Sequence, residues 1–503
     1  MTIPHFPTEI SLIHRRPSRR KPMSGVTQDD TQVDSACIGE LPGGTIFASL
    51  PVELRVEIFR HFCGTFCSLG TVTEGPTFLL RVCRVWAELV LQTPQLWNSF
   101  TLHWPMPGPS KATFLIHALR TFISRSRNLP LSFALRYPVP VDPTCTEVMH
   151  CILPTLSRWL NVTIYAPTAS LIPLWHFETS NSPCLTSFTM ETFGPSPVVL
   201  RGLRFDWVRV TELDLFLIPV PTLDECRRVL AEAVSLRRCS LNATCVLTSD
   251  ELAPLYLPKL EHLQLKLYRM TISDSPHLPF LTFLHSLTTP RLQSLKLSWN
   301  ATQPAHWSTA SSNKLVEFLE KQGEHLDTLN LRYLPLDAQQ ILRCLEVVPD
   351  LKSLNIALVH GDRENDIIDN DFLQSLALNG SGHGRNILPM LQSIRLESHG
   401  EGFGNEALLR LIASRWKYQD NLSAGQLESM DILSPTRHAE YRPRWFKDVW
   451  DGRIDVAAAL KSEFTMMKVL ECFLNEEEYD GKSKCFMNHD FPVHIRSLLV
   501  FDH

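Results

Sequence analysis

The sequence predicts a mixed fold, α+β to α/β, in which a small helical module precedes an irregular solenoid of parallel strands and helices. Three observations lead to this fold class. Apolar residues recur at helical spacing after residue 50, a six-residue pattern with three apolar positions recurs further on, and helical segments separate several copies of that pattern. At 503 residues the chain also exceeds what one hydrophobic core usually supports.

Composition places the chain among ordinary globular proteins. Hydrophobic residues make up 44% and charged residues 20%, and the formal net charge is -5. A negative balance gives no support for a nucleic-acid binder, and no apolar run approaches the roughly 20 residues that span a membrane. The 13 cysteines are odd in number and follow no secretory signal. We therefore expect reduced thiols and a cytoplasmic or nuclear location.

Residues 1–45 are rich in Pro, Ser, Thr, Gly and charge, and they show no periodicity. This composition predicts a disordered basic tail. Its basic cluster, from Arg15 to Lys21, is either a nuclear address or a solvated part of that tail.

Residues 46–105 read as three short helices. Ser49 is placed to cap the first helix, and Glu53 lies in its first turn, where the helix dipole favours a carboxylate. One apolar stripe follows along that helix, formed by Leu50, Leu54, Ile58, Phe59 and Phe62.

A Gly- and Thr-rich loop is expected over residues 64–76. A second helix over 79–90 is apolar on more than one side, and a third short helix after Thr93 carries Leu96 and Trp97. Three short helices cannot cover this much apolar surface alone, so the module is expected to dock on a partner.

The repeating pattern is Leu-x-x-Leu-x-Leu, whose last three positions alternate as in a strand with one buried face. Its ten copies are Trp159–Tyr165, Leu185–Phe188, Val210–Leu215, Leu236–Leu241, Leu260–Leu265, Leu292–Leu297, Leu326–Leu331, Leu351–Ile356, Leu391–Leu396 and Leu427–Ile432. Helical segments lie between some of them, at 224–234, 314–321, 337–347 and 405–414.

The spacing of roughly 25 to 40 residues is within or somewhat above that of leucine-rich repeats. We expect an irregular leucine-rich-repeat solenoid over 106–435, with parallel strands on the concave side and helices on the convex side. Long segments after Leu267 and Ala357 are expected to protrude. Residues 436–503 are expected to form a C-terminal cap or a loosely ordered tail.

Three motifs in the helical module resemble an F-box. Residues 50–59 (LPVELRVEIF) resemble its opening, residues 79–86 (LLRVCRVW) its second helix, and residues 93–97 (TPQLW) its close. They are similar to the version abundant in mushroom-forming fungi, in which divergent leucine-rich repeats follow. The resemblance is specific over residues 50–97 and generic over the repeats.

The resemblance implies a non-catalytic, substrate-recruiting subunit of a Skp–cullin–F-box ubiquitin ligase. The F-box would dock on the Skp-type adaptor, and through it a cullin, while the repeats bind a target protein. The residues that would face the adaptor, or support those that do, are Leu50, Pro51, Leu54, Ile58, Phe59, Val82, Cys83, Trp86, Leu96 and Trp97.

The residues themselves suggest no catalytic, cofactor or metal site. Two groups of potential zinc ligands are His61 with Cys63 and Cys67, and Cys145 with His150 and Cys151. Neither has a second ligand pair at zinc spacing, so small apolar fillers are favoured. The acidic segment 360–371 lacks the ligand spacing of a calcium loop. A phosphate-binding Gly-rich loop and a Gly-x-Ser-x-Gly elbow are both missing.

Several alternatives stay open at this point. The helices are either a docking module or an autonomous bundle, and the chain is either a ligase subunit or an interaction scaffold without ubiquitin transfer. An enzyme of unrecognised type is a third alternative, which no clustered nucleophile, base or metal set supports. The polar residues among or beside the repeat strands either line a binding face or form the solvated side of the sheet; they are His262, Gln264, Lys266, Gln293, Lys296, Asn330, Arg332 and Asn355.

Overall fold

The computed structural model describes residues 47–433, with gaps. The gaps are 48, 72, 104–108, 138–142, 176–181, 195–199, 204, 248–251, 269–276, 301–306, 323–324, 358–366, 379–385, 398–401, 417–426 and 428. The expected disordered tail and the expected C-terminal cap lie outside the described residues, as does most of the acidic segment 360–371.

A single parallel sheet runs through the described residues, and its thirteen strands lie side by side in chain order. The strands are β1 (Cys67–Ser68), β2 (Ser99–His103), β3 (Leu131–Arg136), β4 (Trp159–Pro167), β5 (Ser187–Phe193), β6 (Glu212–Phe216), β7 (Arg238–Thr244), β9 (His262–Tyr268), β11 (Ser294–Asn300), β12 (Thr328–Arg332), β13 (Ser353–Ala357), β14 (Ser393–Glu397) and β15 (Ser429–Leu433). A separate parallel pair is formed by β8 (Leu255–Tyr256) and β10 (Leu287–Thr288).

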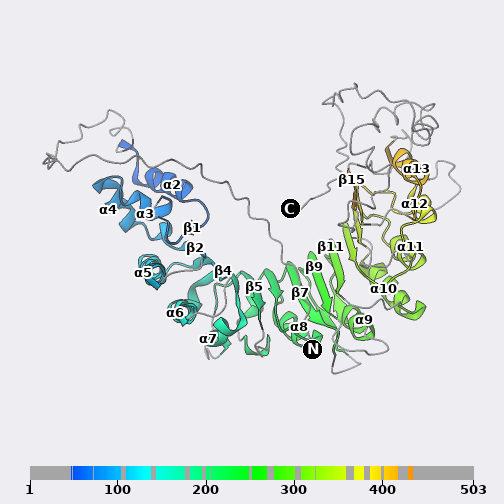
Figure 1. Cartoon of the computed structure of the whole chain (residues 1–503), viewed down its shortest axis with the longest axis horizontal. Helices are drawn as coiled ribbons and strands as arrows, with labels where there is room; N and C mark the ends of the chain where they lie inside the picture. The colour runs from blue at the N-terminus through cyan, green and yellow to red at the C-terminus, as the bar shows by residue number, and fades with distance from the viewer. Residues whose placement is uncertain are drawn as a thin grey trace, which may run out of the picture.

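The sheet bends into an arc with the strands on its concave side and helices on its convex side (Figure 1). The convex helices are α5 (Pro109–Arg125), α6 (Pro143–Ile152), α7 (Ile172–Trp175), α8 (Leu223–Glu232), α9 (His277–Ser286), α10 (Thr309–Gln322), α11 (Ala338–Glu346), α12 (Asn370–Leu376) and α13 (Asn405–Trp416). At the N-terminal end of the arc lie α2 (Val52–Cys63), α3 (Gly75–Leu79) and α4 (Arg84–Gln92).

Short 3-10 helices complete the structure. They are η1 (Pro94–Leu96), η2 (Leu153–Arg158), η3 (Thr168–Leu171), η4 (Leu200–Gly202) and η5 (Trp207–Arg209). None of the helices in the described residues is long and apolar enough to cross a membrane.

The core is a ladder of side chains in register along the arc. Neighbouring strands pair without offset over most of their length, so alternate residues of every strand point toward the helices and are buried. One such buried column is Phe100, Phe133, Val162, Phe188, Leu213, Cys239, Leu263, Leu295, Leu329, Leu354, Ile394 and Met430. All ten predicted segments form strands of this sheet, so the predicted α/β arrangement is confirmed.

Two strands that the leucine pattern missed, β2 and β3, hold aromatic residues instead. Their Phe100 and Phe133 rings stack at 5.6 Å, and Phe133 meets the Trp159 ring edge-on at 5.2 Å. The aromatic pairs fill the same inward column that leucines fill further along the arc.

The long segments after Leu267 and Ala357 were expected to protrude. Each contains a helix, α9 in the first and α12 in the second, and these helices lie in the convex row (Figure 1). Asp369, from the acidic segment, caps α12 by accepting a hydrogen bond from the Phe372 amide at 2.7 Å.

The helical module differs from the prediction at two helix starts. The first helix begins after Pro51, whose backbone is extended in ψ, and no side chain caps it, so the predicted Ser49 cap is wrong. The second predicted helix, over 79–90, is helical only from Arg84, because α3 ends at Leu79 and Cys83 is fully extended before α4. This break reorients the chain so that Trp86 of α4 packs against Phe59 of α2 at 4.9 Å.

The predicted loop over residues 64–76 also contains the first strand of the sheet. Gly64 ends α2 with a φ of 66°, a conformation that favours glycine. Cys67 then pairs with Phe100 in register, which joins β1 to β2. The sheet therefore begins inside the helical module.

A buried arginine links several segments at the C-terminal end of the arc by hydrogen bonds. Arg415 of α13 is 2% exposed and donates to three backbone carbonyls, those of Leu376 (2.7 Å), Ile387 (2.8 Å) and Leu388 (2.8 Å). Burial lowers its pKa to about 10. One side chain thus satisfies the last carbonyl of α12 and two carbonyls of the segment before β14.

We expect Arg415→Met to destabilise this end of the arc by about 3 kcal/mol, because two buried carbonyls and one partly buried carbonyl lose their donor. Native-state hydrogen exchange would show faster exchange in α12 and α13 and unchanged exchange in β3–β9. The matched control is Arg410→Met in the same helix. It removes only an exposed ion pair with Glu406, so we expect it to lower the free energy of unfolding by about 0.5 kcal/mol or less. Equal protection in both variants would contradict this role.

Candidate protein-docking surface

The helical module has a small aromatic core. Phe59 is 1% exposed, and its ring stacks on Phe47 at 5.5 Å and packs against Trp86 at 4.9 Å. Phe47 and Trp86 are 5.0 Å apart, so the three rings touch one another. This triad holds α2 against α4 and supports whatever lies on their outer faces.

Trp97 connects the module to the arc. Its indole Nε1 donates to the Val90 carbonyl at the end of α4 (3.0 Å), and its ring meets Phe122 of α5 edge-on at 5.0 Å. The guanidinium of Arg125, also on α5, lies 4.5 Å from the ring centroid. Trp97 is therefore completely buried at the joint between the two parts.

The outer face of α2 is apolar and uncovered. Leu54, Ile58 and Phe62 are 52%, 45% and 50% exposed, and their spacing of four places them in one row on the helix. Phe62 stacks on Phe78 of α3 at 5.6 Å, which extends the apolar area to the next helix.

Exposed apolar side chains are concentrated in this module. Nine of the sixteen large hydrophobic side chains that are exposed in the described structure lie between residues 52 and 91. We call these nine the N-terminal apolar surface: Val52, Leu54, Ile58, Phe62, Phe66, Phe78, Val82, Val85 and Leu91. Single exposed hydrophobic residues are common on proteins, but such a concentration is typical of an interaction site.

The structure separates the ten predicted adaptor-facing residues into three groups. Pro51, Leu54, Ile58, Val82 and Cys83 are exposed. Leu50 and Trp86 are partly buried, while Phe59, Leu96 and Trp97 are core residues. The last three can act only as support for a docking face. Six members of the N-terminal apolar surface were not among the predicted adaptor-facing residues, because sequence spacing does not show which side of a short helix or loop is covered: Val52, Phe62, Phe66, Phe78, Val85 and Leu91.

The predicted thiol cluster near the end of α2 packs as a filler. The Cys67 thiol lies 3.5 Å from the Cys63 carbonyl and is buried against Gly75. A hydrogen bond with Cys67, together with partial burial, raises the pKa of Cys63. His61 is exposed and lies near Glu57 instead (3.5 Å).

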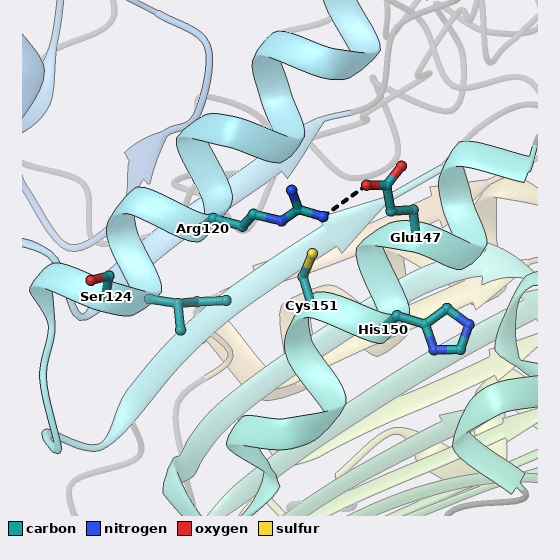
Figure 2. A pocket seen from close by; sticks show the side chains of 6 residues that line it. Arg120, Ser124, Glu147, His150 and Cys151 are labelled. Atoms are coloured by element: carbon teal, nitrogen blue, oxygen red, sulfur yellow. Dashed lines mark hydrogen bonds and ion pairs between the residues drawn. The ribbon is translucent and has the colours of Figure 1, made fainter.

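An open crevice of about 340 Å³ lies between α5 and α6 on the convex side (Figure 2). Arg120 Nη2 and Glu147 Oε1 meet across it at 2.8 Å, and hydrogen bonds with Cys151 and Glu147 raise the pKa of Arg120. The Cys151 sulfur points toward this pair, while the His150 ring points away, so the two do not face one ligand. Within the described residues, no three His, Cys, Asp or Glu side chains are placed to hold a metal ion.

The polar residues predicted beside the strands lie mostly on the concave face. Gln264, Lys266, Lys296, Asn330, Arg332 and Asn355 occupy positions that alternate with the buried columns. His262 begins β9, and Gln293 immediately precedes β11.

Comparison of the chain with models of protein families and with curated proteins finds no match.

The division of α2 into an exposed row and a buried triad can be tested by stability. We expect Leu54→Ser with Ile58→Ser to change the free energy of unfolding by about 0.5 kcal/mol or less per site, because both side chains are already half in water. Phe59→Ala in the same helix removes a fully buried ring and is expected to cost about 3 to 5 kcal/mol. Thermal unfolding of the full chain compares them, and a similar loss in both variants would place the row in the core.

Proposed function

We propose that this protein is a substrate-recruiting subunit of a Skp–cullin–F-box ubiquitin ligase. Its N-terminal apolar surface docks on the Skp-type adaptor, and its arc holds a target protein. The observation that carries the proposal is the coincidence of two features. The residues that resemble an F-box are also those in which exposed apolar side chains are concentrated.

The apolar area of this surface is suited to forming a stable complex with a partner protein. Burying apolar area contributes roughly 25 cal/mol per Å², and specific interfaces usually cover about 1,600 Å² in total. The row on α2 supplies three large side chains for the centre of such an interface. Because the triad of Phe47, Phe59 and Trp86 already fixes α2, little conformational entropy is lost when a partner binds.

In this role the chain contributes proximity and no bond chemistry. A target held on the arc is brought to high effective concentration beside ubiquitin-loading proteins that the adaptor recruits. An interaction scaffold without ubiquitin transfer would use the same apolar surface, so the choice between the two depends on what binds beyond the adaptor.

Co-expression of the full chain with a Skp-type adaptor tests the docking step. We expect a soluble stoichiometric complex with the wild-type chain. Leu54→Glu with Ile58→Glu should weaken adaptor binding by about 100-fold or more, since two carboxylates would enter an apolar interface. The matched control is Ile172→Glu with Val234→Glu, which adds the same charge at similarly exposed apolar positions on the arc and should leave adaptor binding unchanged.

Two further measurements are needed to interpret this experiment: whether each variant is folded, and whether a cullin joins the adaptor complex. Circular dichroism must show that every variant is folded. A folded wild-type chain that fails to bind the adaptor, or a Leu54/Ile58 variant that binds normally, would refute the docking role. Adding a cullin then separates the two functions: co-purification of cullin supports the ligase subunit, and an adaptor complex that excludes cullin supports the scaffold.

A further inference from the structure

The concave face has opposite charge in two regions. The concave-facing positions of β4–β6 carry three carboxylates, Glu191, Glu212 and Asp214, and no lysine or arginine, and of the three Glu212 pairs with Arg238 of β7 at 3.0 Å. Those of β9–β14 carry four cations and one carboxylate, which are Lys266, Lys296, Arg332, Arg395 and Glu397. The net of three positive charges there contrasts with the formal charge of -5 for the whole chain.

Two of the four cations already have partners within the protein. Arg332 Nη2 lies 3.1 Å from Glu397 Oε2, reaching across the small Ala357 that separates them in register. Lys266 Nζ lies 4.7 Å from the centroid of the Phe216 ring and 5.6 Å from that of Tyr268.

The other two cations, Lys296 and Arg395, are exposed. Neither forms an ion pair or a side-chain hydrogen bond with any residue in the described part of the chain. The positive charge that is available to a partner is therefore centred on these two side chains.

Lys296 and Arg395 belong to one row of hydrogen-bond donors. The row, which we call the donor row, consists of Gln264, Lys296, Asn330, Asn355 and Arg395, in register on β9, β11, β12, β13 and β14. Every member carries N–H groups and none is a carboxylate. At about 4.8 Å per strand the row is about 19 Å long, the length of about six residues of extended chain. In the next strand, β15, the same position is Asp431, so the run of donors ends there.

We propose that the donor row binds a short acidic segment of the target protein. Lys296 and Arg395 would pair with carboxylates toward its two ends, and the amides between them would bond to the backbone of the segment. The inference rests on the proposed function, because it names the chemistry of the target that the arc presents.

The surroundings of the row favour a protein segment over a nucleic acid. Each amide side chain of the row carries an acceptor oxygen beside its N–H donors, as Asn330 does with Oδ1. A peptide backbone offers N–H donors to such an acceptor, whereas a phosphodiester backbone offers only acceptors. A long polyanion would also extend from the row across Ser240 to Asp214, which lies in register with the row and would repel it.

Selection of random 12-residue peptides on the full wild-type chain tests the proposal. Enriched peptides should be rich in Asp and Glu, and one of them, labelled with a fluorophore, should bind more weakly as salt is raised. Lys296→Glu with Arg395→Glu should weaken that binding roughly tenfold or more, measured by fluorescence anisotropy. The matched control is Lys321→Glu with Arg343→Glu, which makes the same charge change at exposed positions of α10 and α11 and should leave the affinity unchanged.

Four outcomes would overturn the proposal. They are a selection that enriches no peptide, enriched peptides without acidic residues, an equal loss in both double variants, and tighter binding of a 12-nucleotide single strand than of the peptide. Adaptor co-purification, with the wild-type chain and with the Lys296/Arg395 variant, shows whether a failure concerns the acidic target or the proposed function itself. If adaptor binding is retained while acidic peptides fail to bind the wild-type chain, only the target chemistry is wrong; if the wild-type chain never binds the adaptor, the proposed function itself is wrong.

Discussion

Every strand of the arc depends on its neighbours for burial. A single strand with its helix cannot cover its own inward side chains, so each pair such as Leu329 and Leu331 is enclosed only when the units on both sides are in register. This requirement fixes the parallel pairing from β2 to β14 and the short distance between strands. It leaves the concave-facing positions free, because they contribute little to the buried ladder. The structure therefore separates residues that hold the fold from residues that are available for recognition.

The same requirement explains the position of Trp97. The spacing from Trp97 to Phe100 and Leu102 matches that of the leucine pattern, so this tryptophan occupies the entry position of the first complete strand. It also closes the helical module through its hydrogen bond to Val90 and meets α5 through Phe122 and Arg125. One side chain thus serves two cores, and the module cannot move far from the arc without exposing it.

The strands were predictable wherever leucine marked the buried column, and ten of them were found from that pattern. The strands β2 and β3 were missed because Phe100 and Phe133 fill the column, and β1 was missed because two residues are too few to show alternation. The break at Cys83 has no signal in the sequence, since an apolar run predicts a continuous helix. The break accompanies the packing of Trp86 on Phe59, a contact between residues far apart in the sequence. Of the residues expected at the docking face, the exposed row on α2 follows from helical spacing. Whether Phe59 or Ile58 faces inward depends on where α4 lies, which periodicity does not state.

Because β1 pairs with β2, the helical module also contributes the edge strand at the N-terminal end of the sheet. Only residues 64–66 separate α2 from β1, and β1 is joined to the sheet by its pairing with β2, so this pairing helps to set the orientation of α2 relative to the strands. A protein held on α2 and a protein held on β9–β14 would consequently meet at one angle. Each additional strand–helix unit between them would shift the two by about 4.8 Å and turn them by the twist of one strand. In the proposed ligase role, the number of repeats would therefore determine which lysines on a bound target come within reach, and selectivity among those lysines would depend on the curvature of the sheet.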